Sequence, residues 1–423
     1  MGYSAEQGKS SGFLDQEQLV LLVPRINVHA CCDSPDVADV IRQAAADRRM
    51  SRAHSTVSTG GIAAAVETYQ HKATPNLLVV ESAGGREDIL AGLAALAEVC
   101  RPETKVIVIG TINDVEFYRT LIREGISEYL VKPIQPLQLI EAIGHAFNQP
   151  QSAPLGRVIA FMGAKGGVGS STIAHNVSWT LANAEEMDTV LADLDLAFGC
   201  AGLNFNQEVP PGLPDVLGQP DRVDAMLLER MLIKIDEKLS LLSGPGGFAQ
   251  DFQIEPFAID ALFSAMRASV PFLVLDLPAL WAPWTKSALQ NAEQIVVTAT
   301  PDLSSLRNVK GLVDELLQIR PNDPPPIIVL NQTGVPKRPE IKPNEFSKAI
   351  GLPIATSIPF DAQSFGNAQT NGQMIGELAP KSNAAESVAV LAKMLVGPGR
   401  GGVQEERQSK SFLGKLPFIG RRK

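Results

Sequence analysis

Short apolar runs alternate with amphipathic stretches along the first third of the chain. Apolar runs at 26–31, 77–81, 106–109 and 129–131 predict buried strands. The stretches between them, at 36–46, 61–69, 88–99, 115–124 and 137–147, have apolar positions at helical spacing. Strands that alternate with helices across short loops predict parallel βαβ units with helices on both faces of a sheet. The pattern therefore predicts a doubly wound α/β domain over residues 25–147.

The same alternation returns between residues 157 and 396. A strand at 158–162, a glycine-rich turn and a helix at 172–184 open this region, and further strands are expected at 189–192, 272–275, 294–298 and 327–330. The glycine-rich stretch 239–254 fits no element. A segment rich in Pro, Gln and Ser, 148–156, predicts a linker between two domains. Residues 1–24, which begin with the polar stretch 1–11, and the basic tail 397–423 are expected to be disordered ends.

Composition narrows the classes of protein that fit this chain. Its 423 residues exceed one compact core, which agrees with two domains. The formal net charge of −9 argues against a general positive field for coating nucleic acid. The four cysteines are too few and too scattered for a disulfide framework, and no apolar run matches a signal peptide or a membrane span. We therefore expect a cytoplasmic protein.

A glycine-rich loop stands between the first strand and the first helix of the second domain. Successive glycines let backbone N–H groups converge on phosphate oxygens, and the helix N-terminus adds its dipole. The ordinary P-loop lysine is missing because position 170 is serine, whereas the hydroxyl of Ser171 stands where such loops hold Mg²⁺. The predicted nucleotide-binding residues of the loop are Gly163, Ala164, Lys165, Gly166, Gly167, Val168, Gly169, Ser170, Ser171 and Thr172.

Carboxylates follow two further predicted strands. Asp193 and Asp195 come after one strand, and Asp276 comes after another. Because ligands bind at the carboxyl ends of parallel strands, these acids are expected in the same crevice as the glycine loop. Asp193 and Asp276 are then candidates to hold Mg²⁺ with Ser171, partly through water, and Asp195 is a candidate to orient the attacking water. The sequence therefore predicts ATP and Mg²⁺ as cofactors.

The early lysine of the loop points to a family. The segment Lys165-Gly-Gly-Val-Gly169 resembles the deviant Walker A motif of the MinD/ParA ATPases. That resemblance implies that Lys165 reaches the phosphates of a partner in a nucleotide-sandwich homodimer, that Asn331 reads adenine, and that Lys165 and Asp195 are the catalytic residues. Losing the cation normally present at position 170 from a dry site would lower the rate by about 10²–10³. We therefore expect slow or vestigial ATP hydrolysis.

Several longer segments resemble a narrower family. Residues 272–278, 281–286, 301–310, 330–341 and 358–361 are similar to the CpaE/TadZ proteins of tight-adherence (Flp-type) pilus systems. The resemblance implies an ATP-binding dimer that positions or assembles the pilus secretion machinery, with pilus assembly proteins as partners. A ParA/MinD-type partitioning or cell-division-site ATPase is the alternative. The acidic net charge and the missing lysine argue against DNA as a specific partner.

The same family carries an atypical receiver domain before the ATPase domain. Lys132-Pro133 matches the terminal Lys-Pro of receivers, and Glu81 stands where receivers carry the phosphoacceptor aspartate. The acidic pair expected after the first strand is absent, and Asp33 comes late. We therefore interpret residues 25–147 as a phosphorylation-independent docking and dimerisation module, with Glu81 and Lys132 as a pseudo-phosphoacceptor pair.

Three features leave alternatives open. Residues 410–423 mix basic with aromatic and aliphatic side chains, which suits peripheral contact with the inner face of a membrane, but Pro417 would interrupt a helix there. A solvated or protein-docking end fits equally well, and either a polar or a membrane-peripheral location agrees with the family. Trp281 and Trp284 fit either the core or a partner surface. The five histidines show no ligand spacing, and we expect His175 to pack rather than to react.

Overall fold

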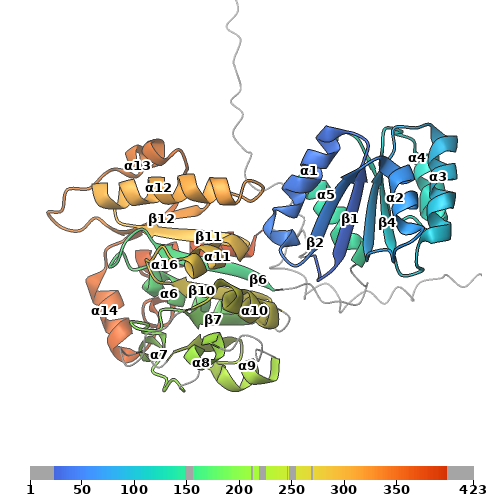
Figure 1. Cartoon of the computed structure of the whole chain (residues 1–423). Coiled ribbons are helices and arrows are strands. Elements are labelled where there is room, and N and C mark those ends of the chain that lie inside the picture. Colours follow the sequence, from blue (N-terminus) through green and yellow to red (C-terminus); the bar gives the residue numbers. More distant parts are fainter. Residues whose placement is uncertain are drawn as a thin grey trace, which may run out of the picture.

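The computed structural model describes residues 23–147, 156–210, 213–218, 225–244, 246, 254–267 and 270–397. They form two α/β units, each with its own sheet (Figure 1). Apart from residues 23–24, 156 and 397, the predicted linker and the two predicted disordered ends lie outside the described residues.

The first unit is a parallel sheet in the order β2-β1-β3-β4-β5, the flavodoxin-like order of doubly wound folds. Its strands are β1 (Asn27–Cys32), β2 (His54–Thr59), β3 (Leu77–Glu81), β4 (Lys105–Gly110) and β5 (Glu128–Val131). Its helices are α1 (Pro35–Ala45), η1 (Arg48–Met50), α2 (Gly61–Tyr69), α3 (Arg86–Val99), α4 (Val115–Arg123) and α5 (Pro136–Phe147). The sequence pattern missed β2 because this edge strand, HSTVST, has one aliphatic residue and buries none of its side chains fully.

Two apolar layers hold the first sheet. Helices α1 and α5 cover one face, and α2, α3 and α4 cover the other (Figure 1). Strand β3 is buried along its whole length, as expected for the central strand of a parallel sheet. Glu81 is the last residue of this strand. It lies at the point where the helices that follow β1 and β3 pack on opposite faces of the sheet, and this is the crevice in which doubly wound folds bind ligands.

The second unit is a larger sheet in the order β13-β12-β11-β6-β10-β7-β9-β8, parallel except between β8 and β9. Its strands are β6 (Arg157–Gly163), β7 (Thr189–Asp193), β8 (Ile233–Lys234), β9 (Leu239–Ser243), β10 (Phe272–Leu277), β11 (Gln294–Ala299), β12 (Ile327–Thr333) and β13 (Ile354–Pro359). Strand β9 occupies the start of the stretch that the sequence left unassigned. Strand β13 was also missed, because most of its residues are only half-buried at the edge of the sheet.

The helices of the second unit form a layer on each face of its sheet. They are α6 (Ser170–Asn183), α7 (Ala201–Asn204), α8 (Leu213–Gly218), α9 (Ala225–Met231), α10 (Pro256–Met266), α11 (Pro283–Asn291), α12 (Leu303–Ile319), α13 (Pro343–Ile350), α14 (Ala362–Asn371), α15 (Ile375–Leu378) and α16 (Asn383–Val396). Helices α10 to α13 cover one face, and α6 and α16 cover the other. Most of α6 is buried, because it lies between the sheet and α16. This packing fixes the helix that follows the glycine loop.

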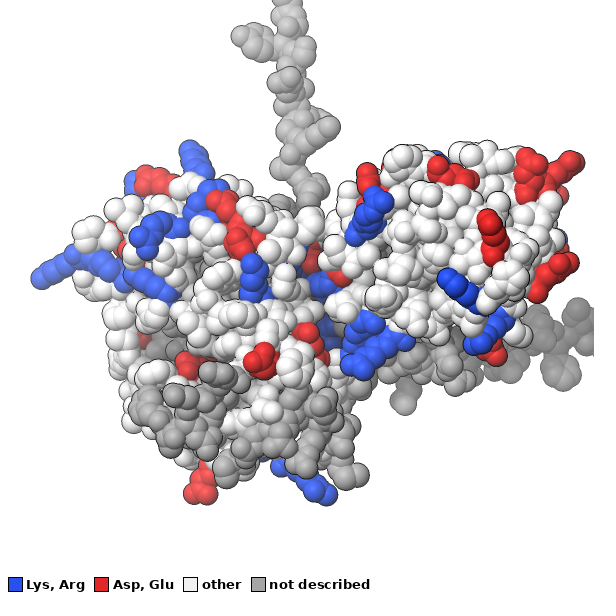
Figure 2. Space-filling view, in the orientation of Figure 1, with Lys and Arg blue, Asp and Glu red and all other residues white. Residues whose placement is uncertain are grey.

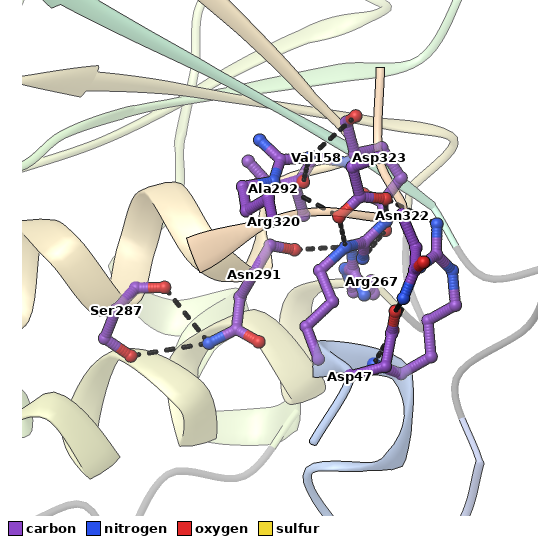
Figure 3. Close-up of polar contacts among 12 residues, drawn as sticks. Asp47, Val158, Arg267, Ser287, Asn291, Ala292, Arg320, Asn322 and Asp323 are labelled. Atoms are coloured by element: carbon purple, nitrogen blue, oxygen red, sulfur yellow. Dashed lines mark hydrogen bonds and ion pairs between the residues drawn. The ribbon is translucent and has the colours of Figure 1, made fainter. Parts of the chain in front are cut away.

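A buried ionic contact joins the two units (Figure 3). Arg48 of η1 donates to Asp323, in the loop between α12 and β12, with 2.9 Å between Nε and Oδ2. Arg49 also donates to Asp323, and Asn322 donates to Asp47 over 3.1 Å. All three charged partners, Arg48, Arg49 and Asp323, keep less than a tenth of their side-chain surface exposed. Arg48 also donates to Glu293 over 3.2 Å, so the interface combines several polar contacts, of which Asp323 accepts from two arginines.

The surface carries both signs of charge. On the face shown in Figure 2, Lys and Arg side chains are interspersed with Asp and Glu. Among the helices of the described ranges, none has the length and apolar character needed to cross a membrane.

Candidate functional site

The glycine loop follows β6 and leads into α6. Gly167 and Gly169 adopt φ angles of 79° and 83°, in the left-handed region that favours glycine. A Cβ atom on Gly169 would lie 2.5 Å from Nδ2 of Asn331, and one on Gly163 would lie 2.8 Å from Cγ2 of Val168. Gly169 is therefore required both by backbone conformation and by close packing, whereas conformation alone favours glycine at 167 and packing alone requires it at 163.

Side chains behind the loop hold its carbonyl groups. Asn331 donates from Nδ2 to the Val168 oxygen over 2.8 Å, and Gln332 donates to the Gly167 oxygen over 3.1 Å. Because the C=O and the next N–H of a planar peptide point in opposite directions, the N–H groups of Val168 and Gly169 face the other side of the loop. Such converging N–H groups form an anion-binding concavity. Asn331 thus braces the loop, and its expected role toward adenine stays a prediction.

Lys165 forms a contact within its own chain. Its Nζ lies 3.0 Å from Oδ2 of Asp302 and 2.8 Å from Oγ of Ser304. Asp302 caps α12 by accepting from the Ser305 N–H over 2.9 Å. Burial would raise the pKa of Asp302, but hydrogen bonds from Ser304, Thr300, Ser305 and Lys165 lower it well below its ordinary value. The lysine is therefore held by a carboxylate that stays ionised.

The hydroxyl positions of the loop lie at the start of α6. Ser170 is buried, and its Oγ has no hydrogen-bond partner among the described residues. Ser171 and Thr172 follow on the first turn and are partly exposed. The position at which a P-loop usually carries lysine is thus occupied by a short, buried, neutral side chain.

Asp193 and Asp276 face each other on neighbouring strands. The two residues are register partners of β7 and β10, so their side chains emerge on the same face of the sheet. The N–H groups of Asp195 and Ala201 donate to Asp193 over 3.1 and 3.0 Å, which orients its carboxylate. A Cβ on Gly199 would lie 2.6 Å from Asp193 Oδ2, so only glycine lets the loop after β7 close over this acid.

Crowding of the two carboxylates changes their electrostatics. Burial and the nearby charge of Asp276 raise the pKa of Asp193 to about 6, although His175 and two backbone hydrogen bonds oppose the shift. Burial, with the charges of Asp193 and Asp276, also raises the pKa of Cys200 to about 11. Placing two carboxylates side by side in a buried site is unfavourable unless a cation lies near them.

His175 is buried, in agreement with the expectation that it packs, but the sequence did not indicate that it packs against these acids. The residue is fully buried on α6, and its Nε2 lies 3.2 Å from Oδ2 of Asp276. Each of His175, Asp193 and Asp276 offers one ligand atom, and these atoms lie within 4.8 Å of one another. The signal in the sequence is helical spacing, because His175 comes four residues after Ser171 and so lies on the same side of the helix.

Asp195 lies beside the two buried acids rather than between them. Its backbone N–H donates to Asp193, while its own Oδ1 accepts from the Phe198 N–H over 3.0 Å. The side chain therefore closes the turn after β7 at the mouth of the site. Its predicted role toward the attacking water stays a prediction.

The first unit has its own buried carboxylate at the equivalent edge of its sheet. Glu81 accepts from the N–H groups of Asp33 and Ser34 over 2.7 and 2.9 Å, from Oγ of Ser34, and from Nζ of Lys132. Burial would raise the pKa of Glu81, but these hydrogen bonds together lower it. Glu81 and Lys132 are thus in direct contact, and Asp33 contributes its backbone to the pair.

The two tryptophans differ in exposure. Trp284 is buried, whereas Trp281 is 48% exposed. Trp281 lines a groove of about 480 Å³ together with Gly163 and Ala164 at the start of the glycine loop. Lys286 Nζ lies 5.7 Å from the centre of the Trp281 ring.

Three comparisons with known proteins bear on this site, and no protein-family profile matches the chain. A solved structure of the pilus assembly protein CpaE from Caulobacter crescentus is 49% identical over 30% of this chain and 98% of that chain, with a TM-score of 0.30. An uncharacterised ATP-binding protein of Methanocaldococcus jannaschii is 24% identical over 62% of this chain and 97% of its own length. The septum site-determining protein MinD of Pyrococcus horikoshii, solved with Mg-ADP, is 21% identical over 57% of this chain and 96% of that chain, with a TM-score of 0.50.

Proposed function

Because the chain belongs to the CpaE family of pilus assembly proteins and its second unit has the MinD/ParA-like fold, we propose that it binds ATP with Mg²⁺ at residues 163–172. The observation that supports this most is the loop itself. Its left-handed glycines, and its carbonyl groups held by Asn331 and Gln332, leave the Val168 and Gly169 N–H groups on the opposite side of the loop, next to the N-terminus of α6, where such groups can bind phosphate.

The donors around the loop also fit a divalent cation. A hydroxyl at Ser171 and carboxylates at Asp193 and Asp276 are oxygen ligands of the kind that Mg²⁺ uses together with nucleotide phosphates. Mg²⁺ bound there would neutralise charge on the phosphates. In this proposal Asp193 and Asp276 act partly through water, and Asp195 orients the attacking water.

The proposal includes a homodimer with nucleotide at its centre. Lys165 is already at the mouth of the loop, where Asp302 and Ser304 hold its ammonium group. Both contacts lie at the surface-exposed start of α12, so Lys165 can exchange them for the phosphates of a second copy without unfolding any element. Asp302 thereby acts as the resting partner of the lysine.

Hydrolysis in this proposal is slow. Ser170 brings no positive charge to the phosphates, and electrostatic stabilisation dominates phosphoryl transfer. The dimer therefore serves as an ATP-held platform for pilus assembly proteins, and residues 25–147 dock partners without phosphorylation because Glu81 is already bound by Lys132. The groove beside Trp281 is a second docking surface on this platform.

Nucleotide-dependent sizing tests the proposal. Size-exclusion chromatography with light scattering should show a monomer without nucleotide and a dimer with MgATP, and Lys165→Ala should abolish the dimer. Lys310→Ala is the matched control, because Lys310 is an exposed lysine on α12 that pairs with Asp314. Calorimetry that detects no uptake of ATP in the presence of Mg²⁺ would overturn the proposal.

A second experiment tests the reason for slow turnover. Ser170→Lys restores the missing cation and should raise steady-state ATP hydrolysis by about 10²–10³, the effect of one well-placed donor in a preorganised site. Turnover of the unchanged chain at the level of ordinary ATPases would contradict the proposed role of Ser170.

A further inference from the structure

A surface groove of about 500 Å³ lies between α2 and α3 of the first unit, which run side by side (Figure 1). The residues that line it include several with no side chain or only a methyl group, Gly60, Ala63, Gly92 and Ala95. A Cβ atom on Gly92 would lie 2.9 Å from Cγ2 of Ile62, so glycine at this position lets the two helices pack closely. Because glycine inside a helix is unfavourable relative to alanine, this packing gives Gly92 a structural reason. The groove is thus built into the packing of the two helices.

The lining of the groove combines apolar side chains with carboxylates. Ile62 and Val66 of α2 contribute aliphatic surface, and Asp33, Glu67 and Asp88 are exposed acids of the lining. Among the described residues, no lysine or arginine lines this groove. A surface of this kind attracts a ligand that carries positive charge together with apolar side chains.

The size of the groove fits a short peptide. It follows α2 from Ala63 to Gln70 and α3 from Asp88 to Ala95, which is about 10 Å along each helix. An extended peptide covers that distance with about three residues. The volume also falls within the range of about 300–1,000 Å³ that ligand-binding pockets have. The groove therefore holds a few side chains of a peptide rather than a whole domain.

The groove beside Trp281 in the second unit serves as a comparison. Its volume is about 480 Å³, but its lining includes Arg307 as well as Glu315. Glu315 is moreover paired with Lys286 over 2.6 Å. The two grooves are thus similar in size and differ in charge, and the groove of the first unit is the one that favours a basic occupant.

This chain contains a segment of complementary chemistry. Residues 410–423, KSFLGKLPFIGRRK, carry five basic side chains and no acidic one, interleaved with aromatic and aliphatic residues. Two other stretches outside the described residues flank the first unit. Residues 1–22 carry three acids and one lysine, and residues 148–155 carry no charged side chain. Of these three segments, charge complementarity therefore selects 410–423.

The position at which this segment leaves the second unit favours contact with the first. Gly397, the last described residue before it, follows α16, and the guanidinium of Arg157 donates to the Leu395 oxygen over 2.8 Å at the end of that helix. Arg157 is the first residue of β6, where the chain arrives from the first unit. The stretch from Gly397 to Lys410 can extend over about 45 Å, whereas a domain of the first unit's length is roughly 35 Å across. The segment can therefore reach the groove of its own chain or of a second copy.

We propose that the groove between α2 and α3 binds the basic segment 410–423 of this chain. The aromatic and aliphatic side chains of the segment cover the apolar part of the groove, and its lysine and arginine side chains pair with the three acids. This inference goes beyond the proposed ATP site and does not depend on nucleotide, because every described residue that lines the groove belongs to the first unit.

Fluorescence anisotropy with a labelled synthetic peptide of residues 410–423 tests the contact in the absence of nucleotide. The peptide is titrated with the full chain and with a chain that ends at Ser409. We expect saturable binding to the shortened chain and weaker binding to the full chain by about tenfold or more, because its own segment occupies the groove at a high effective concentration. Equal affinity for the two chains would overturn the proposal.

Substitutions in the shortened chain locate the binding site. Glu67→Lys reverses one charge of the lining, and Ala63→Arg fills the groove with a long cationic side chain. Both positions are exposed on α2, so the helix tolerates the changes. Each variant should weaken peptide binding by about fivefold or more. Glu124→Lys is the matched control, because it makes the same change of charge at an exposed position at the end of α4, outside the lining, and its affinity should stay within about twofold.

A second peptide separates specific docking from general attraction between charges. Phe412→Ser and Phe418→Ser together keep every charge, and we expect this peptide to bind more weakly by about fivefold or more because apolar contact is lost. An equal loss of affinity in Glu67→Lys and Glu124→Lys, with no effect of the two serines, would show charge attraction alone and overturn the groove. Binding of the original peptide to vesicles of phosphatidylglycerol but not to the shortened chain would also overturn it, and would make a membrane the partner of this segment.

Discussion

The two units carry buried carboxylates at corresponding edges of their sheets, yet the surroundings of these carboxylates are opposite. Glu81 accepts hydrogen bonds from two backbone N–H groups, a serine hydroxyl and a lysine, and its pKa is lowered despite burial. Asp193 and Asp276 lie side by side, and the pKa of Asp193 is raised to about 6. Glu81 is neutralised by a lysine of its own unit, whereas Asp193 and Asp276 crowd each other at the position where the proposed function has a cation.

Whether the chain itself compensates the charge of a buried carboxylate distinguishes a structural acid from a candidate ligand-binding acid better than its burial or its position on the sheet. Both sites follow the rule that ligands bind at the carboxyl ends of parallel strands. Lys132 supplies the positive charge that Glu81 needs, so the first edge gains little from a metal ion. Asp323 at the interface of the two units resembles Glu81, because Arg48, Arg49 and Arg320 surround it and its pKa is lowered.

Of the variants predicted here, Asp323→Ala, which removes the carboxylate that the interface arginines share, should lower the free energy of unfolding most. Asp323→Ala removes one carboxylate partner from each of three arginines that have little exposed surface, although Arg48 keeps Glu293 and Arg49 keeps Asp47. Breaking such a buried pair costs about 3–5 kcal/mol. Urea unfolding of the full chain measures the loss. Small-angle scattering shows whether the two units separate, which would let the arginines reach water.

Asp314→Ala is the control for the interface. Asp314 pairs with Lys310 on the exposed side of α12, where removing an ion pair costs about 0.3–0.5 kcal/mol. Unchanged scattering together with a loss below about 1 kcal/mol for Asp323→Ala would show that the ionic contact does not hold the units together.

Glu81→Ala should cause the next largest loss of stability. The substitution leaves the N–H groups of Asp33 and Ser34 and the ammonium of Lys132 without their acceptor. Lys132 keeps 18% of its side chain exposed and can turn toward water, so we expect a loss of about 3 kcal/mol. Thermal unfolding measures the loss. Glu81→Gln retains an acceptor and should lose less, and equal losses for the two variants would rule out the hydrogen bonds as the cause.

Most of the fold could be predicted from the sequence because its central strands are long apolar runs. Strand β3 and helix α2 have the predicted bounds, and the expected doubly wound α/β fold with a mostly parallel sheet is confirmed. The missed strands, β2, β8, β9 and β13, are polar, only two residues long, followed by a glycine-rich stretch or half-buried at an edge. Their place is determined by pairing with neighbours, which a local pattern does not contain.

Only those residues of the candidate site that belong to a recognisable sequence motif could be predicted. The glycine loop and the acids Asp193 and Asp276 follow from strand ends, and the structure places the acids together. His175 and Asp302 were missed because each acts through residues far away in the sequence. The histidine is 101 residues from Asp276, so its role appears only when α6 packs against β10.

The pH dependence of stability should also differ between the two acids. The folded pKa of Asp193, about 6, lies above its ordinary value of 3.8, so its contribution is fully present below about pH 4 and is lost as the pH rises through about 6. Asp276, His175 and Cys200 face it. Glu81 contributes in the opposite sense, because its stabilisation is lost as the pH falls below its ordinary value of 4.5.

The Asp193 contribution can be isolated by difference. Without divalent cations, the unfolding free energy of the unchanged chain relative to Asp193→Asn should fall between about pH 4 and pH 6, by on the order of 2 kcal/mol. Urea unfolding in EDTA across this range gives the difference. A difference that stays constant with pH would mean that neither burial nor Asp276 raises the pKa of Asp193 in the folded chain.

Asp276→Asn should change the free energy of unfolding least in the absence of metal ions, and it should increase that free energy rather than lower it. Replacing one of two crowded carboxylates by a neutral amide removes their repulsion, so at pH 7.5 in EDTA the variant should be more stable by about 1 kcal/mol, whereas Glu81→Gln should be less stable. Divalent cations should then raise the melting temperature of the unchanged chain, because a bound cation removes the repulsion between the two carboxylates. The melting temperature of Asp276→Asn should not change, because the amide has already removed that repulsion. If Asp276→Asn is instead less stable than the unchanged chain and cations still raise its melting temperature, Asp276 resembles Glu81, whose charge is already compensated by other residues of the chain.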